Sequence, residues 1–203
     1  MSFQSTSIQN LGGWLGRLFT LDFTVFDDVR SQPSASTPAL VVVAGASVLA
    51  GIGSWLWAVQ TDGVDASDVF IKSLILGATV QTLVWFLWVY LTYQVLVRGY
   101  NARTDFAELV RTMGFAFAPV AFSLGIAITV FAMPIGIVAF AMAVLFSNVA
   151  VQHASDAEVR EATLANVTGF AVFAIVMGLF ANTLEVGTVG GLAPGILFFS
   201  LDF

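Results

Sequence analysis

Long stretches without charge dominate the pattern of polar and apolar positions along the chain. Four runs contain no Asp, Glu, Lys or Arg: Ser31–Thr61, Ser73–Val97, Thr112–Ser155 and Ala162–Leu184. They are 31, 25, 44 and 23 residues long. A helix needs about 20 apolar residues to cross a bilayer, so three runs fit one crossing each and the run of 44 fits two. The pattern predicts an all-α, polytopic membrane helix bundle with five transmembrane helices.

Prolines and polar positions indicate where these spans begin and end. The predicted spans are Pro38–Ala58, Ile71–Val97, Phe106–Phe131, Ile135–Gln152 and Ala162–Leu184. Pro119 lies inside the third span, where its missing N–H and its ring predict a kink. Pro134 marks the turn into the fourth span, so we expect the third and fourth spans to form a tight antiparallel hairpin. Ser155 with Glu158 matches a capping box at the start of the last helix.

A second pattern precedes the first span. The apolar residues of positions 11–19 fall on one helical face: Leu11, Trp14, Leu15, Leu18 and Phe19. Positions 23–29 repeat this pattern in a shorter form. Both segments are predicted to be short amphipathic helices lying along the membrane surface. The alternative is that they pack against the ends of the spans.

These elements divide the chain into three parts. Residues 1–36 are expected to form an N-terminal segment with amphipathic helices, and residues 37–185 the five-span domain. Residues 186–203 form an apolar tail that is too short and too rich in glycine to cross again. Within the first span, Ala46, Ala50 and Ser54 form a row of small residues, which allows a neighbouring helix to approach closely.

Composition supports a membrane location and excludes several functions. Hydrophobic residues make up 58% of the chain and charged residues 10%, whereas soluble domains carry about 25% charged residues. The net charge of −6 excludes a basic nucleic-acid-binding surface. The chain contains no Cys, so it has neither a disulfide nor a thiolate ligand for a metal. Membrane lipids are therefore the first partners to expect.

The distribution of cations predicts how the protein is inserted. Six arginines fall in the N-terminal segment and the loops on one side of the predicted spans: Arg17, Arg30, Arg98, Arg103, Arg111 and Arg160. The opposite side carries Lys72. By the positive-inside rule, the N-terminus is predicted to be cytoplasmic and the C-terminus outside, in a multi-pass protein of the cell membrane.

Candidate chemistry is sparse. His153 is the one histidine of the sequence, and we expect it to cap the end of the fourth span beside Gln152 and Asn148 rather than to sense pH. No acid or base lies in the middle of a predicted span, and no nucleophile or metal-ligand motif is present. Lys72 could pair with Glu185, although each could equally reach into lipid headgroups. No catalytic residue, cofactor or metal is predicted, and the protein is not expected to be an enzyme.

Polar residues within or near the spans leave two interpretations open. They are Gln81, Gln94, Ser123, Ser147, Asn148 and Asn182. Together they could line a path for a small solute. Alternatively, they hydrogen-bond between helices, each with a modest energy of about 0.6 kcal/mol.

The most distinctive local sequence is Gly114-Phe115-Ala116-Phe117-Ala118-Pro119, in which small residues alternate with aromatic ones. Gly114, Phe115 and Pro119 resemble the Gly-Tyr/Phe-x-x-x-Pro signature of the Yip1 family. A cytoplasmic N-terminal segment and five closely spaced spans are also similar to that family. The segment Leu21-Asp22-Phe23-x-x-Phe26 looks like a lead-in of its prokaryotic branch, which more often has Pro at the position of Phe23.

This resemblance implies a fold but no catalytic residues. Eukaryotic members are associated with Rab GTPases, yet their Asp-Leu-x-Gly-Pro segment has no counterpart here, so a Rab-type partner is not expected. The leading hypothesis is a non-enzymatic scaffold that contacts lipids, a membrane-protein partner or further copies of itself. A transporter or channel for a small or neutral solute is the alternative. A third hypothesis is that residues 11–30 sense membrane shape.

Overall fold

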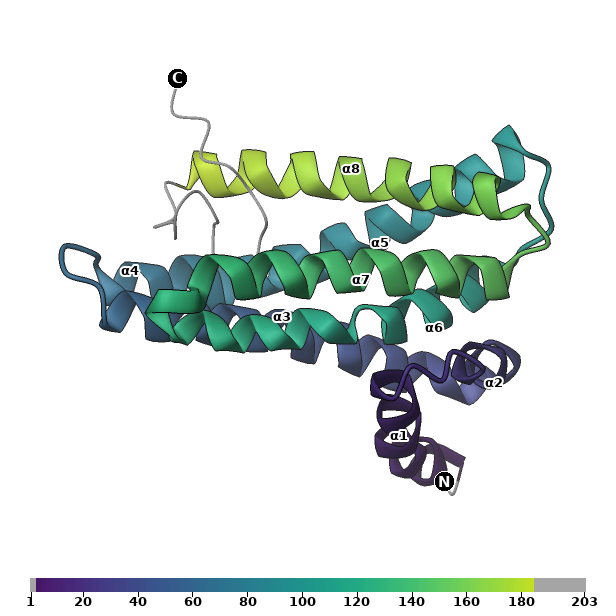
Figure 1. Ribbon diagram of the computed structural model, residues 1–203, viewed down its shortest axis with the longest axis horizontal. Coiled ribbons are helices and arrows are strands. Elements are labelled where there is room, and N and C mark those ends of the chain that lie inside the picture. The colour runs from purple at the N-terminus through teal and green to yellow at the C-terminus, as the bar shows by residue number, and fades with distance from the viewer. Residues whose placement is uncertain (1–2, 185–203) are drawn as a thin grey trace.

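The computed structural model describes residues 3–184, and the regular elements of this part of the chain are helical (Figure 1). Five helices in it are long and apolar enough to cross a membrane, which confirms the predicted all-α bundle and its span count. They run Pro33–Val59, Ala66–Gly99, Phe106–Ala127, Thr129–Ala154 and Val159–Thr183. The predicted tail and Glu185 lie outside the described residues.

The spans lie side by side along the long axis of the molecule, while α1 (Phe3–Phe19) runs across that direction (Figure 1). Next to α1 lies α2 (Val25–Ser31), near one end of the bundle. This end also holds the loop between the second and third spans and the loop between the fourth and fifth. We call it the basic end, because Arg98, Arg103 and Arg160 lie there.

Hydrogen bonds join the loops at the basic end. The backbone N–H of Arg103 donates to the Asp156 carboxylate at 2.6 Å, and the Thr104 hydroxyl donates to the carbonyl of Ala154 at 2.7 Å. The end of the second span is thereby tied to the end of the fourth.

The first span contains α3 (Ser36–Val59), which begins two residues earlier than predicted. Its row of small residues, Ala46, Ala50 and Ser54, is buried as expected. Two glycines of the same helix, Gly51 beside this row and Gly53, make closer contacts. A Cβ atom at Gly51 would lie 2.8 Å from the backbone of Leu74, and one at Gly53 would lie 2.3 Å from the carbonyl oxygen of Ser123. The second and third spans therefore approach α3 at backbone distance.

The second span is a continuous helix that changes its winding three times. After α4 (Ala66–Val69) come a π-helical segment at Phe70–Gly77, the helix α5 (Ala78–Gln94) and a second π segment at Val95–Gly99. The Asp65 side chain caps the beginning by accepting from two backbone N–H groups. The predicted bounds of this span were therefore too narrow.

The third span differs most from the prediction of one kinked helix. It consists of α6 (Phe106–Ala116) and a 3₁₀ segment η4 (Ala118–Ala127), and a short 3₁₀ turn at Thr129–Phe131 leads into the fourth span. Pro119 has no N–H to continue the α-helical pattern and stands in the first turn of η4. Runs of 3₁₀ helix longer than about four residues are uncommon, so η4 needs support from its neighbours. The close contact between Gly53 and Ser123 supplies part of it.

Two helix starts also differ from the predictions. The fourth span, α7 (Ala132–Ala154), begins before Pro134, which lies in its first turn, where a missing N–H costs little. The fifth, α8 (Val159–Thr183), is capped by Glu158 and Glu161 instead of Ser155 and Glu158. Ser155 is the C-cap residue of α7, and α8 begins only after Glu158, so Ser155 lies three residues too early to cap it.

Candidate functional site

The three motif residues of the third span do not converge on one site: Gly114 and Phe115 contact two different helices, and Pro119 lies in the 3₁₀ segment η4. Gly114 faces α3, where an added Cβ would lie 2.8 Å from the Cβ of Ala39. Phe115 is buried and packs edge-on against Trp14 of α1, with ring centroids 5.5 Å apart. Pro119 is buried at the start of η4. The motif therefore joins α6 to a span, to the N-terminal helices and to the 3₁₀ segment.

The N-terminal helices pack against the spans, as one of the two predictions proposed. In α2, the side chains of Val25, Phe26 and Val29 are fully buried. In α1, the apolar face divides into two stripes. Trp14 and Leu18 are buried in the protein. The other stripe, Leu11, Leu15 and Phe19, borders a pocket.

Arg111 fastens α2 to the third span. Its guanidinium is almost completely buried and donates from Nε and Nη2 to the backbone carbonyl of Arg30, at 3.1 and 2.7 Å. The last carbonyls of a helix have no partner inside the helix and carry partial negative charge. Arg111 therefore satisfies an acceptor at the C-terminal end of α2. The sequence analysis counted Arg111 only as a cation that indicates sidedness.

Three further contacts hold α2 against the spans. Arg30 lies 3.1 Å from the Glu108 carboxylate of α6 and donates to the backbone carbonyl of His153 in α7. The Nδ1 atom of His153 lies 3.0 Å from a carboxylate oxygen of Asp27. His153, which was expected to cap the end of the fourth span, thus has its partner on α2, and the sequence analysis did not identify Asp27. We call Asp27, Arg30, Glu108, Arg111 and His153 the α2 clasp.

Removing the Arg111 guanidinium from the α2 clasp should loosen α2. Arg111→Met keeps most of the apolar stem but leaves the Arg30 carbonyl without its donor, which costs about 1–3 kcal/mol for a buried group. Since 1.4 kcal/mol corresponds to a factor of 10, we expect backbone amides of α2 to exchange with deuterium at least about tenfold faster. Exchange measured by mass spectrometry on residues 25–31 tests this.

The control for this experiment is Arg103→Met, because Arg103 is an exposed arginine at the same end of the bundle. It should leave exchange in α2 unchanged. Equal acceleration in both variants would show that overall charge, and not the contact with the Arg30 carbonyl, holds α2.

A compact group of polar contacts forms the corner between α1 and α2. The guanidinium of Arg17 pairs with Asp22 at 2.8 Å and with Asp28, and it also donates to the Thr24 hydroxyl. Hydrogen bonds from Thr24 and Arg17 hold the pKa of the Asp22 carboxyl below its usual range. The same carboxylates raise the pKa of Arg17. The corner is thus arranged to stay charged, and it fixes the angle between the two helices.

Aromatic side chains fill the middle of the bundle around Phe117, which follows the last residue of α6. Its ring lies 6.4–6.5 Å, centroid to centroid, from four buried rings on α5, α7 and α8: Trp85, Trp88, Phe140 and Phe173. The sequence analysis noted the alternation of aromatic and small residues but assigned no role to Phe117. Its place between Phe115 and Pro119 was the available signal.

Of the six predicted intramembrane polar residues, Gln81 bonds between helices. Gln81 of α5 donates to Ser47 of α3 at 3.2 Å. Asn166 of α8, which was not singled out from sequence, accepts from the Trp88 indole at 3.1 Å and donates to the carbonyl of Val144 in α7 at 3.1 Å. Asn166 thereby links three spans.

Other predicted polar residues have no such role in the described structure. Within residues 3–184, the hydroxyls of Ser123 and Ser147 and the carbonyl oxygen of the Asn148 side chain are buried without a hydrogen-bond partner. Gln94 and Asn182 lie near opposite ends of the bundle, at the ends of α5 and α8. Lys72 pairs with Asp68 one turn away, at 2.8 Å. Glu185, the partner suggested for Lys72 from the sequence, is outside the described residues.

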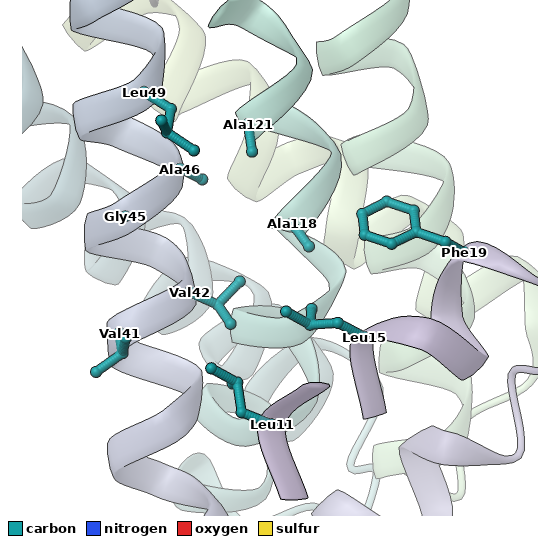
Figure 2. Close-up of a pocket in the computed structure, with 10 residues that line it drawn as sticks. All are labelled: Leu11, Leu15, Phe19, Val41, Val42, Gly45, Ala46, Leu49, Ala118 and Ala121. Carbon is teal, nitrogen blue, oxygen red and sulfur yellow. The ribbon is translucent and has the colours of Figure 1, made fainter. Parts of the chain in front are cut away.

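An apolar pocket of about 210 Å³ lies between α1, α3 and η4 (Figure 2). Val42, Ala46 and Leu49 line it from α3, and Ala118 and Ala121 line it from η4. Leu11 and Leu15 approach it from α1, and Figure 2 shows the Phe19 ring at its edge. The lining consists of hydrocarbon side chains and a glycine, so the pocket fits an apolar occupant.

In the part of the chain that the structure describes, no group of three or more His, Asp or Glu residues is placed to hold a metal ion. The geometry supports packing and docking instead. No family model, curated protein or solved structure matches the chain.

Proposed function

We propose that the protein is a non-enzymatic scaffold in the membrane, which acts through contacts with lipids and with a membrane-protein partner. The observation that carries this proposal is the divided apolar face of α1. One stripe, with Trp14 and Leu18, attaches the helix to the bundle, while the other borders an apolar pocket. A helix that runs across the spans and is attached in this way can present a fixed surface at the membrane interface.

The direction of insertion belongs to the same proposal. The N-terminal helices and most arginines lie at the basic end, so the positive-inside rule favours a cytoplasmic location for that end. The surface formed by α1 and α2 would then face cytoplasmic partners. The assignment to the Yip1 family stays a prediction that rests on Gly114, Phe115 and Pro119.

Affinity purification of the full-length protein from native membranes, followed by mass spectrometry, tests the scaffold. We expect a membrane protein or a second copy of the chain to co-purify with the wild type. Arg111→Met should reduce this recovery, because it loosens α2, and Arg103→Met should not. A strictly monomeric protein that recovers nothing from any membrane would contradict the proposal.

A transporter for a small neutral solute is the second candidate, and the interrupted third span favours it. Helix interruptions at membrane depth are tolerated where they are buried in protein or line a cavity. The 3₁₀ segment η4 carries the buried, unpartnered hydroxyl of Ser123. Flux of glycerol or urea into reconstituted liposomes, abolished by Pro119→Ala, would support transport. Flux equal to that of empty liposomes would exclude these solutes and favour the scaffold.

A further inference from the structure

We infer that the pocket between α1, α3 and η4 binds one acyl chain of a membrane phospholipid, with α1 as its lid. This inference rests on the proposed function and names a partner for the same surface. The pocket opens toward the outer face of the spans, because Val41 at its rim is 52% exposed. In a bilayer this face meets acyl chains.

The pocket also lies at the depth of acyl chains. The helix α3 begins at Ser36, and the pocket extends along it from Val41 to Leu49. At 1.5 Å per residue, these positions lie about 8 and 20 Å along the helix. Because one leaflet contributes about half of a hydrocarbon core about 30 Å thick, the pocket begins in the leaflet nearest the basic end and reaches the centre of the bilayer.

Two aromatic contacts hold α1 over this space. Trp14 packs against Phe115 of α6, and Phe19 packs against Phe122 of η4 with ring centroids 5.2 Å apart. Leu11 and Leu15 therefore border the pocket from the side of α1 without filling it (Figure 2). An apolar cavity of about 150 Å³ in a soluble protein is already large enough to bind benzene, so a pocket of about 210 Å³ has room for a stretch of hydrocarbon chain.

Binding of the acyl chain would be driven by van der Waals contact with the pocket lining and not by removal of the chain from water. Lipid tails are as apolar as leucine, so moving a chain from the bilayer into the pocket gains no hydrophobic energy. An unfilled void, however, deprives its lining of van der Waals partners. A chain in the pocket restores these contacts for α3, η4 and α1 together. The bound phospholipid would thus help to seat α1.

Gly45 offers a direct way to fill the pocket. It lines the pocket, and a Cβ atom built on it meets nothing within 4 Å, so a leucine there can extend into the space without a backbone clash. Its neighbour Ala44 is exposed on the adjoining face of the same helix and does not line the pocket. Gly45→Leu and Ala44→Leu therefore form a matched pair at one depth.

The test is photolabelling of the full-length protein in phosphatidylcholine liposomes that contain a phosphatidylcholine with a mid-chain diazirine. We expect labels on residues 11–19, 41–49 and 118–121 in the wild type and in Ala44→Leu. Gly45→Leu should lower labelling of residues 11–19 by about tenfold, equivalent to about 1.4 kcal/mol of binding free energy. Unchanged labelling in Gly45→Leu, or equal loss in both variants, would overturn the inference.

Two additions keep this result separate from other failures. If Gly45→Leu does not fold, Ala121→Leu fills the same pocket from η4 and should give the same loss. Labelling needs no protein partner. A scaffold that recruits nothing from native membranes would therefore still show a labelled pocket, and a pocket without label would leave the partner experiment standing.

Discussion

Gly53→Ala is expected to destabilise the bundle by about 1–3 kcal/mol, the usual cost of inserting a methyl group into a packed core. The new Cβ atom would lie 2.3 Å from the Ser123 carbonyl oxygen and 2.9 Å from the Cα atom of Leu124. Both are backbone atoms of η4, so no side chain can rotate to relieve the overlap. The helix α3 must separate from the third span along their contact. Unfolding by SDS in mixed micelles, followed by circular dichroism, measures the effect.

Gly45→Ala is the matched control, because Gly45 lies two turns earlier on the same helix and its added Cβ would meet no atom within 4 Å. Alanine favours a helix over glycine by about 1 kcal/mol, so this variant should be as stable as the wild type or more stable. The same intrinsic gain acts at Gly53, where the clash must outweigh it. If the two variants unfold at the same SDS fraction, the close contact at Gly53 is not important for stability.

The spans could be predicted from sequence because the bilayer imposes a local rule. A segment must be long, apolar and helical to cross, and charge-free runs therefore mark the crossings directly. The start of α6 is also set locally, since the Asp105 side chain accepts from the backbone N–H groups of Ala107 and Glu108. Such features need no knowledge of neighbouring helices.

The winding inside the spans could not be predicted in this way. Pro119 indicated a disruption, but the length of η4 depends on neighbours such as Gly53, which is distant in sequence. The π segment that begins at Phe70 likewise lies where Gly51 meets Leu74. Helix periodicity treats every span as a uniform α-helix, so it cannot report a change of winding that a partner helix stabilises.

The clasp was missed for a related reason. Arg111 and His153 were considered as single residues at a membrane interface, where cations and histidines are ordinary. Their roles depend on α2 lying across the ends of α6 and α7, with Arg111 bonded to the carbonyl of Arg30 and His153 beside Asp27. A short amphipathic helix has no sequence feature that states which surface it covers. The docking position therefore had to come from the structure.

Phe117 packs against buried rings from α5, α7 and α8. Phe117→Ala should therefore be the most damaging single truncation in the bundle. Deleting a buried Phe side chain costs about 3–5 kcal/mol in soluble cores. We expect about 3 kcal/mol here, the low end, because lipid tails also solvate apolar groups of the unfolded chain. The void would leave Trp85 and Trp88 without a neighbour on one side. The SDS fraction at which the protein unfolds measures the loss of stability, and the emission maximum of tryptophan fluorescence reports the change around Trp85 and Trp88.

The control for this truncation is Phe131→Ala, because Phe131 lies in the 3₁₀ turn that follows η4 and is 58% exposed. It removes the same atoms from a lipid-facing position, so the unfolding free energy should change by less than about 0.5 kcal/mol. If Phe117→Ala were equally mild, the aromatic group would be loosely packed and the third span would not be held by its core. If it behaves as expected, the break between α6 and η4 is stabilised by the ring of Phe117, and the motif Gly114-Phe115-x-x-x-Pro119 acts around a residue that the motif itself does not specify.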